Sequence, residues 1–327
     1  MKFGVSVSNI GNLGQGIGVE GCIEIAERAD ALGFDSVWLG DHVVLPAQID
    51  YDEDHADRRG ATRWQNNAFE PLTLLNALAV RTERVMLNQG VLIIPLRHPV
   101  ILAKMLATAD QLSGGRLVLG AGLGWMDKEF SALGLPEEYF PRRGAVTNEY
   151  LRAIKELWTS TGPSTFRGEF VQFENVGAYP KPVQQPHPRI VIGGKSRAAM
   201  RRAVRLGDGL DCGAESPEEL AGYVAQLHDI CHAEGRDPNE IEISMGWLLR
   251  PNGPHGMRFA SRAHAGDEER PLFNGTPDEI VSDLRRFATA GLRHFVTLPR
   301  DEEGSTGFER ILRGMEIMAR EILPAFR

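Results

Sequence analysis

The chain alternates between runs of apolar residues and stretches whose apolar positions recur at helical spacing, and residues 90–125 show this pattern most clearly. Two nearly all-apolar runs, VLII and RLVLGAGLG, flank the helical pattern HPVILAKMLATADQLSG. Runs without polar alternation are typical of parallel strands that are covered on both faces. The helical stretch has Pro99 at a plausible first position and stops at Gly114 and Gly115. This segment therefore predicts a strand, a helix and a second strand.

The same pattern recurs along the whole chain and predicts a closed barrel. Helical stretches between the apolar runs often open with Ser-Pro or Thr-Pro and close on Gly, which are typical start and stop signals. A series of eight such units favours an α/β fold, a single-domain (β/α)8 TIM barrel over residues 1–327. An open doubly wound sheet is the alternative, but a run of eight units favours closure. The eight candidate strands lie near Lys2–Ser8, Ser36–Gly40, Val85–Ile93, Arg116–Ala121, Arg189–Gly193, Gly209–Cys212, Ile241–Leu249 and His294–Leu298.

Three segments are longer than ordinary loops, at about 42–67, 125–182 and 250–274. They follow the second, fourth and seventh predicted strands. The second segment contains a predicted helix, RRGAVTNEYLRAIKELW, and an alternating stretch, TFRGEFVQFENV, that predicts a hairpin around Arg167-Gly168. A TIM barrel carries its active site at the carboxyl ends of its strands. We therefore expect all three insertions to act as lids over that face.

Composition narrows the range of partners. The formal net charge of -8, without a Lys/Arg-rich block, argues against nucleic acid. No apolar run is long enough to span a membrane and the first residues do not resemble a secretion signal, so we expect a cytoplasmic protein. Three widely spaced cysteines predict reduced, structural thiols. The absence of HxH, HExxH and GxSxG patterns argues against a metal site and a serine hydrolase.

Three blocks of sequence resemble the bacterial luciferase-like flavin superfamily, and most closely its coenzyme F420-dependent branch. They are SVWLGDHVVLP, GVLIIPLRHPVILAKMLATADQLSGGRLVLGAGLGW and PKPVQQPHPRIVIGGKSRAAMRRAVRLGDG, and the resemblance extends from Lys2 to about Leu298. It implies an F420-dependent oxidoreductase that acts on a small molecule, and relatives often form homodimers. One alternative is an FMN-dependent monooxygenase that uses reduced flavin and oxygen. An alternative of another class is a non-catalytic flavin-binding protein.

Asp41 and His42 directly follow the apolar strand SVWLG and so lie on the rim of the expected site. An imidazole titrates near neutral pH. The resemblance implies a catalytic role for this pair, with His42 in proton transfer or substrate orientation. In the alternative interpretation, Asp41 holds loop backbone and His42 packs beneath it.

The resemblance also implies a bulge in the third strand, with a non-prolyl cis peptide between Gly90 and Val91 that supports the central ring of the cofactor. Asn88 and Gln89 are polar residues within an apolar strand, and they either donate to ring carbonyls or bond inside the barrel. Gly122 is one of the glycines that leave bare backbone at the end of the fourth strand.

Gly193, Gly194, Lys195 and Ser196 end the fifth predicted strand and begin a helix. Free N–H groups and the helix dipole at such a start favour an anion, so this turn predicts a site for the cofactor phosphate. The alternative is a tight turn capped by Ser196.

Dehydrogenases of the F420-dependent branch carry a proton-donating glutamate directly after the glycines of the fourth strand, but this chain has Trp125 there. Asp127 or Glu129 could reach the site from the following segment, or both could form a solvated helix start. We expect the substrate pocket to contain Trp64, Trp125, Glu129 and Trp247, and we expect no metal.

Overall fold

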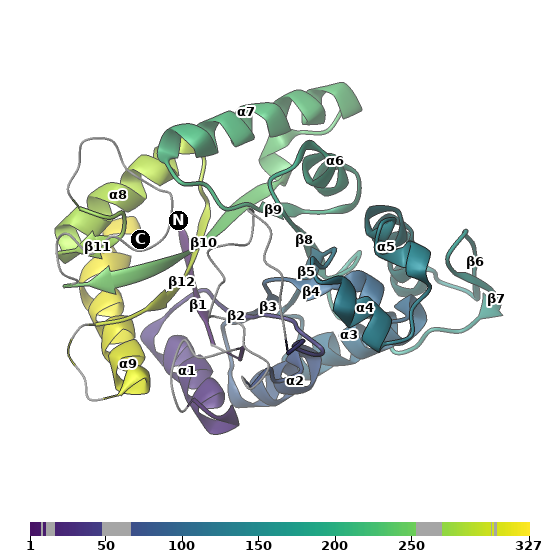
Figure 1. Ribbon diagram of the computed structural model, residues 1–327, viewed down its shortest axis with the longest axis horizontal. Helices are drawn as coiled ribbons and strands as arrows, with labels where there is room; N and C mark the ends of the chain where they lie inside the picture. Colours follow the sequence, from purple (N-terminus) through teal and green to yellow (C-terminus); the bar gives the residue numbers. More distant parts are fainter. Residues whose placement is uncertain (8, 11–16, 48–66, 253–269, 302, 304–305) are drawn as a thin grey trace.

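In a computed structural model of the chain, eight parallel strands close into a barrel surrounded by helices (Figure 1). The structure describes residues 1–327 except 8, 11–16, 48–66, 253–269, 302 and 304–305. Around the barrel the order is β10, β12, β1, β2, β3, β5, β8 and β9, and β9 pairs with β10 to close it. The predicted TIM barrel is confirmed. Its strands are β1 (Lys2–Ser6), β2 (Ser36–Leu39), β3 (Met86–Gln89), β5 (Leu117–Gly122), β8 (Arg189–Gly193), β9 (Gly209–Asp211), β10 (Glu242–Pro251) and β12 (His294–Pro299).

One helix follows each barrel strand, and the predicted capping signals are in place. Ser216 and Thr276 cap their helices with side-chain oxygens, each followed by a proline. Gly33 and Gly114 end helices with φ of 82° and 66°, a region that favours glycine. The barrel helices are α1 (Val19–Leu32), α2 (Pro71–Arg81), α3 (Pro99–Ser113), α5 (Arg143–Thr159), α6 (Arg197–Leu206), α7 (Pro217–Glu234), α8 (Pro277–Ala290) and α9 (Gly307–Ile317).

The third barrel strand is interrupted, as the resemblance implies. The peptide between Gly90 and Val91 is cis, and the strand resumes as β4 (Leu92–Ile93), which pairs with β5. Neighbouring glycines make room for this bulge. A Cβ at Gly122 would lie 2.2 Å from Cγ2 of Val91, and a Cβ at Gly193 would lie 2.7 Å from its Cγ1. These two glycines therefore accommodate the Val91 side chain.

The insertion expected at 125–182 is smaller than its predicted bounds. Its long helix is α5, which packs against α3 as a regular barrel helix. The predicted hairpin is confirmed as β6 (Ser164–Arg167) and β7 (Gln172–Val176), which extend away from the barrel beside α5 (Figure 1). The buried Glu149 carboxylate holds the hairpin turn by accepting hydrogen bonds from the N–H groups of 169, 170 and 171. The other two expected insertions, at about 42–67 and 250–274, lie mostly outside the described residues, because 48–66 and 253–269 are not described.

Shorter elements complete the fold. A small apolar cluster of Ile93, Leu96 and Phe130 packs α4 (Asp127–Ala132) against η3 (Ile94–Leu96). A short strand that the sequence pattern did not predict, β11 (Asn274–Gly275), pairs with the end of β10. The remaining short helices are η4 (Glu137–Tyr139), η5 (Pro238–Glu240), η6 (Met318–Ile322) and η7 (Leu323–Phe326).

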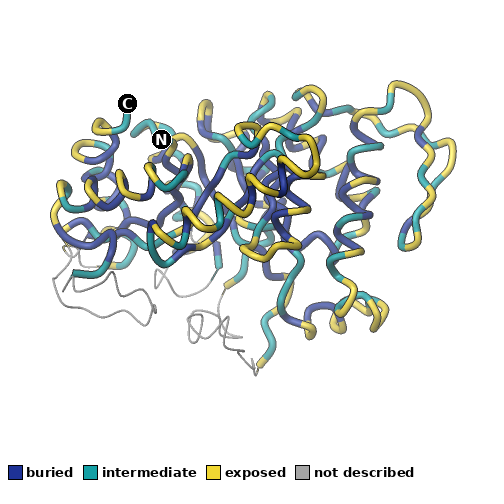
Figure 2. The backbone as a smooth tube through the Cα atoms, turned by 90° about the horizontal axis from the view of Figure 1, so that it is seen from above, coloured by how far each residue is buried: buried dark blue, intermediate teal, exposed yellow. Residues whose placement is uncertain are grey.

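The apolar core lies between the sheet and the helices, and Figure 2 shows the exposed residues on the outer turns. Arg116 secures the amino-terminal side of the barrel by donating to the carbonyls of Ala79, Thr82 and Val85. All three cysteines are free and buried, which confirms the predicted structural thiols. Within the described part of the chain, no helix is long and apolar enough to cross a membrane.

Candidate active site

The predicted site residues at the carboxyl ends of β2, β3, β5 and β8 meet at one face of the barrel, because these strands are neighbours and parallel. The Val91 side chain lies against Gly122 and Gly193, as described above. The N–H of Ile93, just past the bulge, donates to Asp41 at 2.8 Å. The carboxyl ends of the strands therefore place Asp41, His42, the Gly90–Val91 bulge and Gly193 around one centre.

Asp41 anchors the rim of this face. Its buried carboxylate accepts two hydrogen bonds from Arg97, at 2.6 and 2.9 Å, in addition to that from Ile93. Arg97 also donates to Glu70 at 3.0 Å. Burial lowers the pKa of Arg97, but the two carboxylates outweigh this effect and hold that pKa above its ordinary value. Both oxygens of Asp41 are committed to these bonds, so the carboxylate joins Arg97 to the backbone of Ile93 at the rim.

His42 pairs with Glu129 instead of with its sequence neighbour Asp41. Nδ1 of His42 lies 3.2 Å from Oε2 of Glu129, and Oε1 of Glu129 accepts a 2.9 Å hydrogen bond from the N–H of Val43. The imidazole is 7% exposed, and its Nε2 makes no hydrogen bond with any residue that the structure describes. Glu129 therefore orients the ring, and Nε2 is left to give or take a proton.

The interpretation of Glu129 as part of a solvated helix start is wrong. Glu129 is 0% exposed, whereas Asp127, two residues earlier on α4, is exposed. The adjacent Phe130 packs against Ile93 and Leu96 and anchors α4 on the barrel. The sequence feature that could have indicated a buried Glu129 is an acid next to an aromatic residue at the start of a short helix.

The tryptophans that we expected in the substrate pocket do not lie together. Trp125 packs edge to face on His42, with ring centroids 6.1 Å apart. Trp247 packs on Phe273, at 6.0 Å, and Phe273 belongs to the apolar core. Trp64 lies outside the described residues. Of the expected pocket residues that the structure describes, Trp125 and Glu129 lie beside His42.

A helix cap and an exposed lysine both occur in the turn formed by Gly193, Gly194, Lys195 and Ser196. Gly194 has φ of 121°, and its N–H donates to the backbone carbonyl of Asp211 at 2.8 Å. Ser196 caps α6 by accepting from the N–H of Ala199 at 3.2 Å. The Lys195 side chain is 57% exposed, with Nζ 4.0 Å from Glu219. An exposed ammonium beside a helix N-terminus can hold a phosphate.

Asn88 and Gln89 lie on the buried strand β3. Both side chains are buried, and neither oxygen has a hydrogen-bond partner in the described part of the chain. Asn88 pairs in register with Trp38, and a Cβ on Gly90 would lie 2.6 Å from that indole ring. Trp38 therefore packs beneath Gly90, and Asn88 faces a cavity nearer the amino ends of the strands.

Asp211 is a titratable group that the sequence interpretation did not select. It ends β9, pairs in register with Gly193, and accepts a 2.9 Å hydrogen bond from Oγ of Ser244. Burial raises the pKa of its carboxyl to about 6, while the Ser244 bond and His294 oppose the shift. The sequence feature that could have indicated Asp211 is a lone acid in the apolar strand GLDC.

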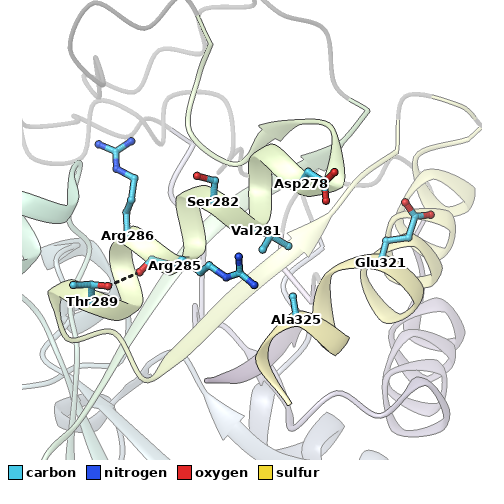
Figure 3. Close-up of a pocket in the computed structure, with 8 residues that line it drawn as sticks. All are labelled: Asp278, Val281, Ser282, Arg285, Arg286, Thr289, Glu321 and Ala325. Carbon is cyan, nitrogen blue, oxygen red and sulfur yellow. Dashed lines mark hydrogen bonds between the residues drawn. The ribbon is translucent and has the colours of Figure 1, made fainter.

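A separate cleft of about 550 Å³ lies between α8 and the C-terminal turns, outside the barrel (Figure 3). Its lining includes Asp278, Arg285, Arg286 and Glu321, and it contains none of the predicted site residues. The described residues include no group of three His, Cys, Asp or Glu side chains that could hold a metal ion.

A family model and several known proteins match the sequence of this chain. Residues 1–249 match the family model described as luciferase-like monooxygenase. An F420-dependent glucose-6-phosphate dehydrogenase of Amycolatopsis mediterranei is 29% identical over 306 residues, 84% of this chain and 86% of that protein. An FMNH(2)-dependent dimethylsulfone monooxygenase of Pseudomonas putida is 38% identical over 180 residues, 55% of this chain. The chain thus spans only 48% of that protein's length.

Solved structures show the same fold over the full chain. The monooxygenase RslO1 from Streptomyces bottropensis superposes with a TM-score of 0.78 and 25% identity, covering 100% of both chains. An F420-dependent secondary alcohol dehydrogenase, solved with an F420-acetone adduct, has a TM-score of 0.77 and 22% identity over 100% of this chain and 99% of that one.

Proposed function

The chain belongs to the luciferase-like monooxygenase family, and we propose that it is an oxidoreductase that uses coenzyme F420 to transfer a hydride to or from a small organic substrate. The observation that carries this proposal is the buried His42–Glu129 pair at the carboxyl face that also bears the Gly90–Val91 bulge. An oriented imidazole with one unused nitrogen is suited to move the proton that accompanies hydride transfer.

The residues at this face fit a flavin-like cofactor. The Gly90–Val91 bulge, with Val91 seated against Gly122 and Gly193, offers a rigid backbone surface for the flat ring. Lys195 and the start of α6 offer positive charge for the phosphate. When bound, the deazaflavin supplies the redox chemistry at C5, and the protein supplies orientation and proton handling.

Each of the chain's own groups has a distinct task in this proposal. Nε2 of His42 gives or takes the proton, and the Glu129 carboxylate keeps the proton on Nδ1 and stabilises the charged ring. Asp41 and Arg97 fix the rim from which His42 projects. The Trp125 ring shields the imidazole from water on one side.

F420 is preferred over FMN because the F420-dependent relative aligns with 84% of the chain, almost end to end, whereas the FMN-dependent relative aligns with 55%. We also propose that residues 48–66 and 253–269 contribute to substrate selection, because both segments follow carboxyl ends of barrel strands.

An FMN-dependent monooxygenase is the second candidate, favoured by the higher identity, 38%, to the dimethylsulfone enzyme. The two candidates differ in whether turnover consumes oxygen. The test supplies the protein with reduced F420 or reduced FMN and a panel of small aldehydes and ketones, and follows cofactor oxidation and dissolved oxygen against a protein-free control. Oxidation of reduced F420 without oxygen uptake supports the proposal. Substrate-dependent oxygen uptake with reduced FMN alone contradicts it.

A further inference from the structure

A cavity of about 480 Å³ occupies the interior of the barrel at the end opposite to His42. Its lining includes the residues that begin β1, β3, β8, β10 and β12, so it opens at the amino ends of the strands. This volume lies in the range of small-molecule sites. The Trp38 ring, which packs beneath Gly90, lies between this cavity and the candidate active site.

Asn88 presents an unpaired carboxamide to this cavity. The residue is 3% exposed, and its Oδ1 is buried without a hydrogen-bond partner. The side chain makes no hydrogen bond with any residue that the structure describes. Leaving such a group unpaired costs about 1–3 kcal/mol. A partner that both accepts from Nδ2 and donates to Oδ1 would satisfy it.

The other polar side chains of the inner wall already have hydrogen-bond partners. Nε1 of Trp38 donates to Oγ of Ser36 at 2.8 Å, and the same oxygen lies 2.8 Å from Nε2 of His294. Oγ of Ser244 donates to Asp211 at 2.9 Å. Val118 and Val191 supply apolar wall. Asn88 is therefore the polar side chain of the inner wall that lacks a hydrogen-bond partner among the described residues.

Several charged groups at the mouth have charged partners. Glu242 lies 2.6 Å from Lys2, 3.5 Å from Arg189 and 3.4 Å from His294. Burial raises the pKa of Glu242, but the hydrogen bonds from His294 and Lys2 outweigh this and lower it to about 2. Arg84 pairs with Asp30 at 3.8 Å. Arg327 donates to the carbonyl of Gly33 and has no acidic partner among the described residues. The charged groups lie at the mouth, whereas Asn88, Val118, Val191 and Trp38 form the inner wall, so the ligand edge that meets Asn88 is neutral.

We propose that this cavity is a second binding site, which takes a small neutral molecule with an apolar body and one carboxamide or lactam edge. The edge forms paired hydrogen bonds with the Asn88 side chain, and the apolar body lies between Val118, Val191 and Trp38. The proposal is independent of the chemistry at the carboxyl face, because no residue assigned there lines the cavity.

The test is calorimetric titration of the whole protein with benzamide, benzoate and toluene as probes. These three share a ring and differ in the edge, which is a neutral amide, an anion or a methyl group. We expect benzamide to bind at least tenfold more tightly than the other two. Asn88→Leu, which keeps a similar shape, should weaken benzamide binding at least tenfold and leave toluene binding unchanged or tighter.

Two further variants locate the binding. Val118→Phe fills the cavity and should abolish binding of benzamide and toluene. Asn76→Leu is the matched control, because its Oδ1 is also buried and unpaired but the residue lies on α2, away from the cavity. It should leave benzamide binding unchanged. Absence of benzamide binding to the native protein, or benzamide binding that survives Asn88→Leu, overturns the proposal.

Discussion

Nδ1 of His42 and Oε2 of Glu129 lie 3.2 Å apart inside the protein, although the two residues are 87 positions apart in the sequence. The contact joins the loop after β2 to the short helix α4 after β5. It supplies an acid beside the imidazole even though Trp125 stands where the F420-dependent branch carries its glutamate. The pair is the basis of two predictions about turnover.

His42→Ala should lower the turnover rate about 10²-fold or more while cofactor affinity is nearly retained, because the loss of a positioned acid or base acts on the chemical step. Steady-state rates and a direct cofactor titration of the same preparation measure the two effects separately. If turnover survives and only the melting temperature falls, His42 is a packing residue.

Glu129→Gln should lower turnover about tenfold to hundredfold, because the amide still accepts the N–H of Val43 but no longer stabilises a charged imidazole. Asp127→Asn is the matched control, since Asp127 is exposed on the same helix. It should leave the rate unchanged. Equal losses in the two variants would show that the effect comes from α4 as a whole and would contradict the orienting role of Glu129.

Lys195→Ala should weaken cofactor binding by about 1–2 kcal/mol and leave the fold intact, because a charge-assisted contact to phosphate is lost from an exposed side chain. Arg201→Ala, an exposed change farther along α6, is the control. Fluorescence titration of both variants measures the difference. Unchanged affinity in Lys195→Ala would remove this turn from the site.

The Asp211 carboxyl should make stability depend on pH. Its pKa of about 6 in the folded protein lies above the ordinary value of 3.8, so the folded state binds this proton more tightly than the unfolded state does. The resulting stabilisation is complete below about pH 4 and is lost as the pH rises through about 6.

Asp211→Asn removes this dependence. The variant should gain about 2–3 kcal/mol of unfolding free energy relative to the native protein between about pH 4 and pH 7. Urea unfolding at several pH values measures the gain. A difference between the two proteins that stays constant across this range would contradict the burial of a titrating Asp211.

The barrel could be predicted because its signal is local and repeated. Apolar strands, helical periodicity and caps such as Thr276 and Gly114 mark each unit in sequence order. The limits of the second insertion could not be predicted in the same way. The helix now seen as α5 has the same periodicity whether it covers the barrel or stands apart, and only its packing on α3 decides.

The site was predicted in part. Residues at strand ends, such as His42 and Gly90, follow from the rule that barrel strands end at one face. The partner of His42 does not follow, because a contact across 87 positions depends on how α4 packs on the barrel. The inward direction of Asn88 was likewise undetermined, since the sequence interpretation left both of its possible partners open.

The most direct test of the central claim is which cofactor the apoprotein prefers. Titration of the purified protein with coenzyme F420 and, separately, with FMN can be followed through the fluorescence of its 5 tryptophans. We predict micromolar or tighter binding of F420, about -8 kcal/mol, and at least tenfold weaker binding of FMN. FMN binding as tight as or tighter than F420 binding, accompanied by oxygen uptake with reduced FMN, would contradict the F420-dependent assignment.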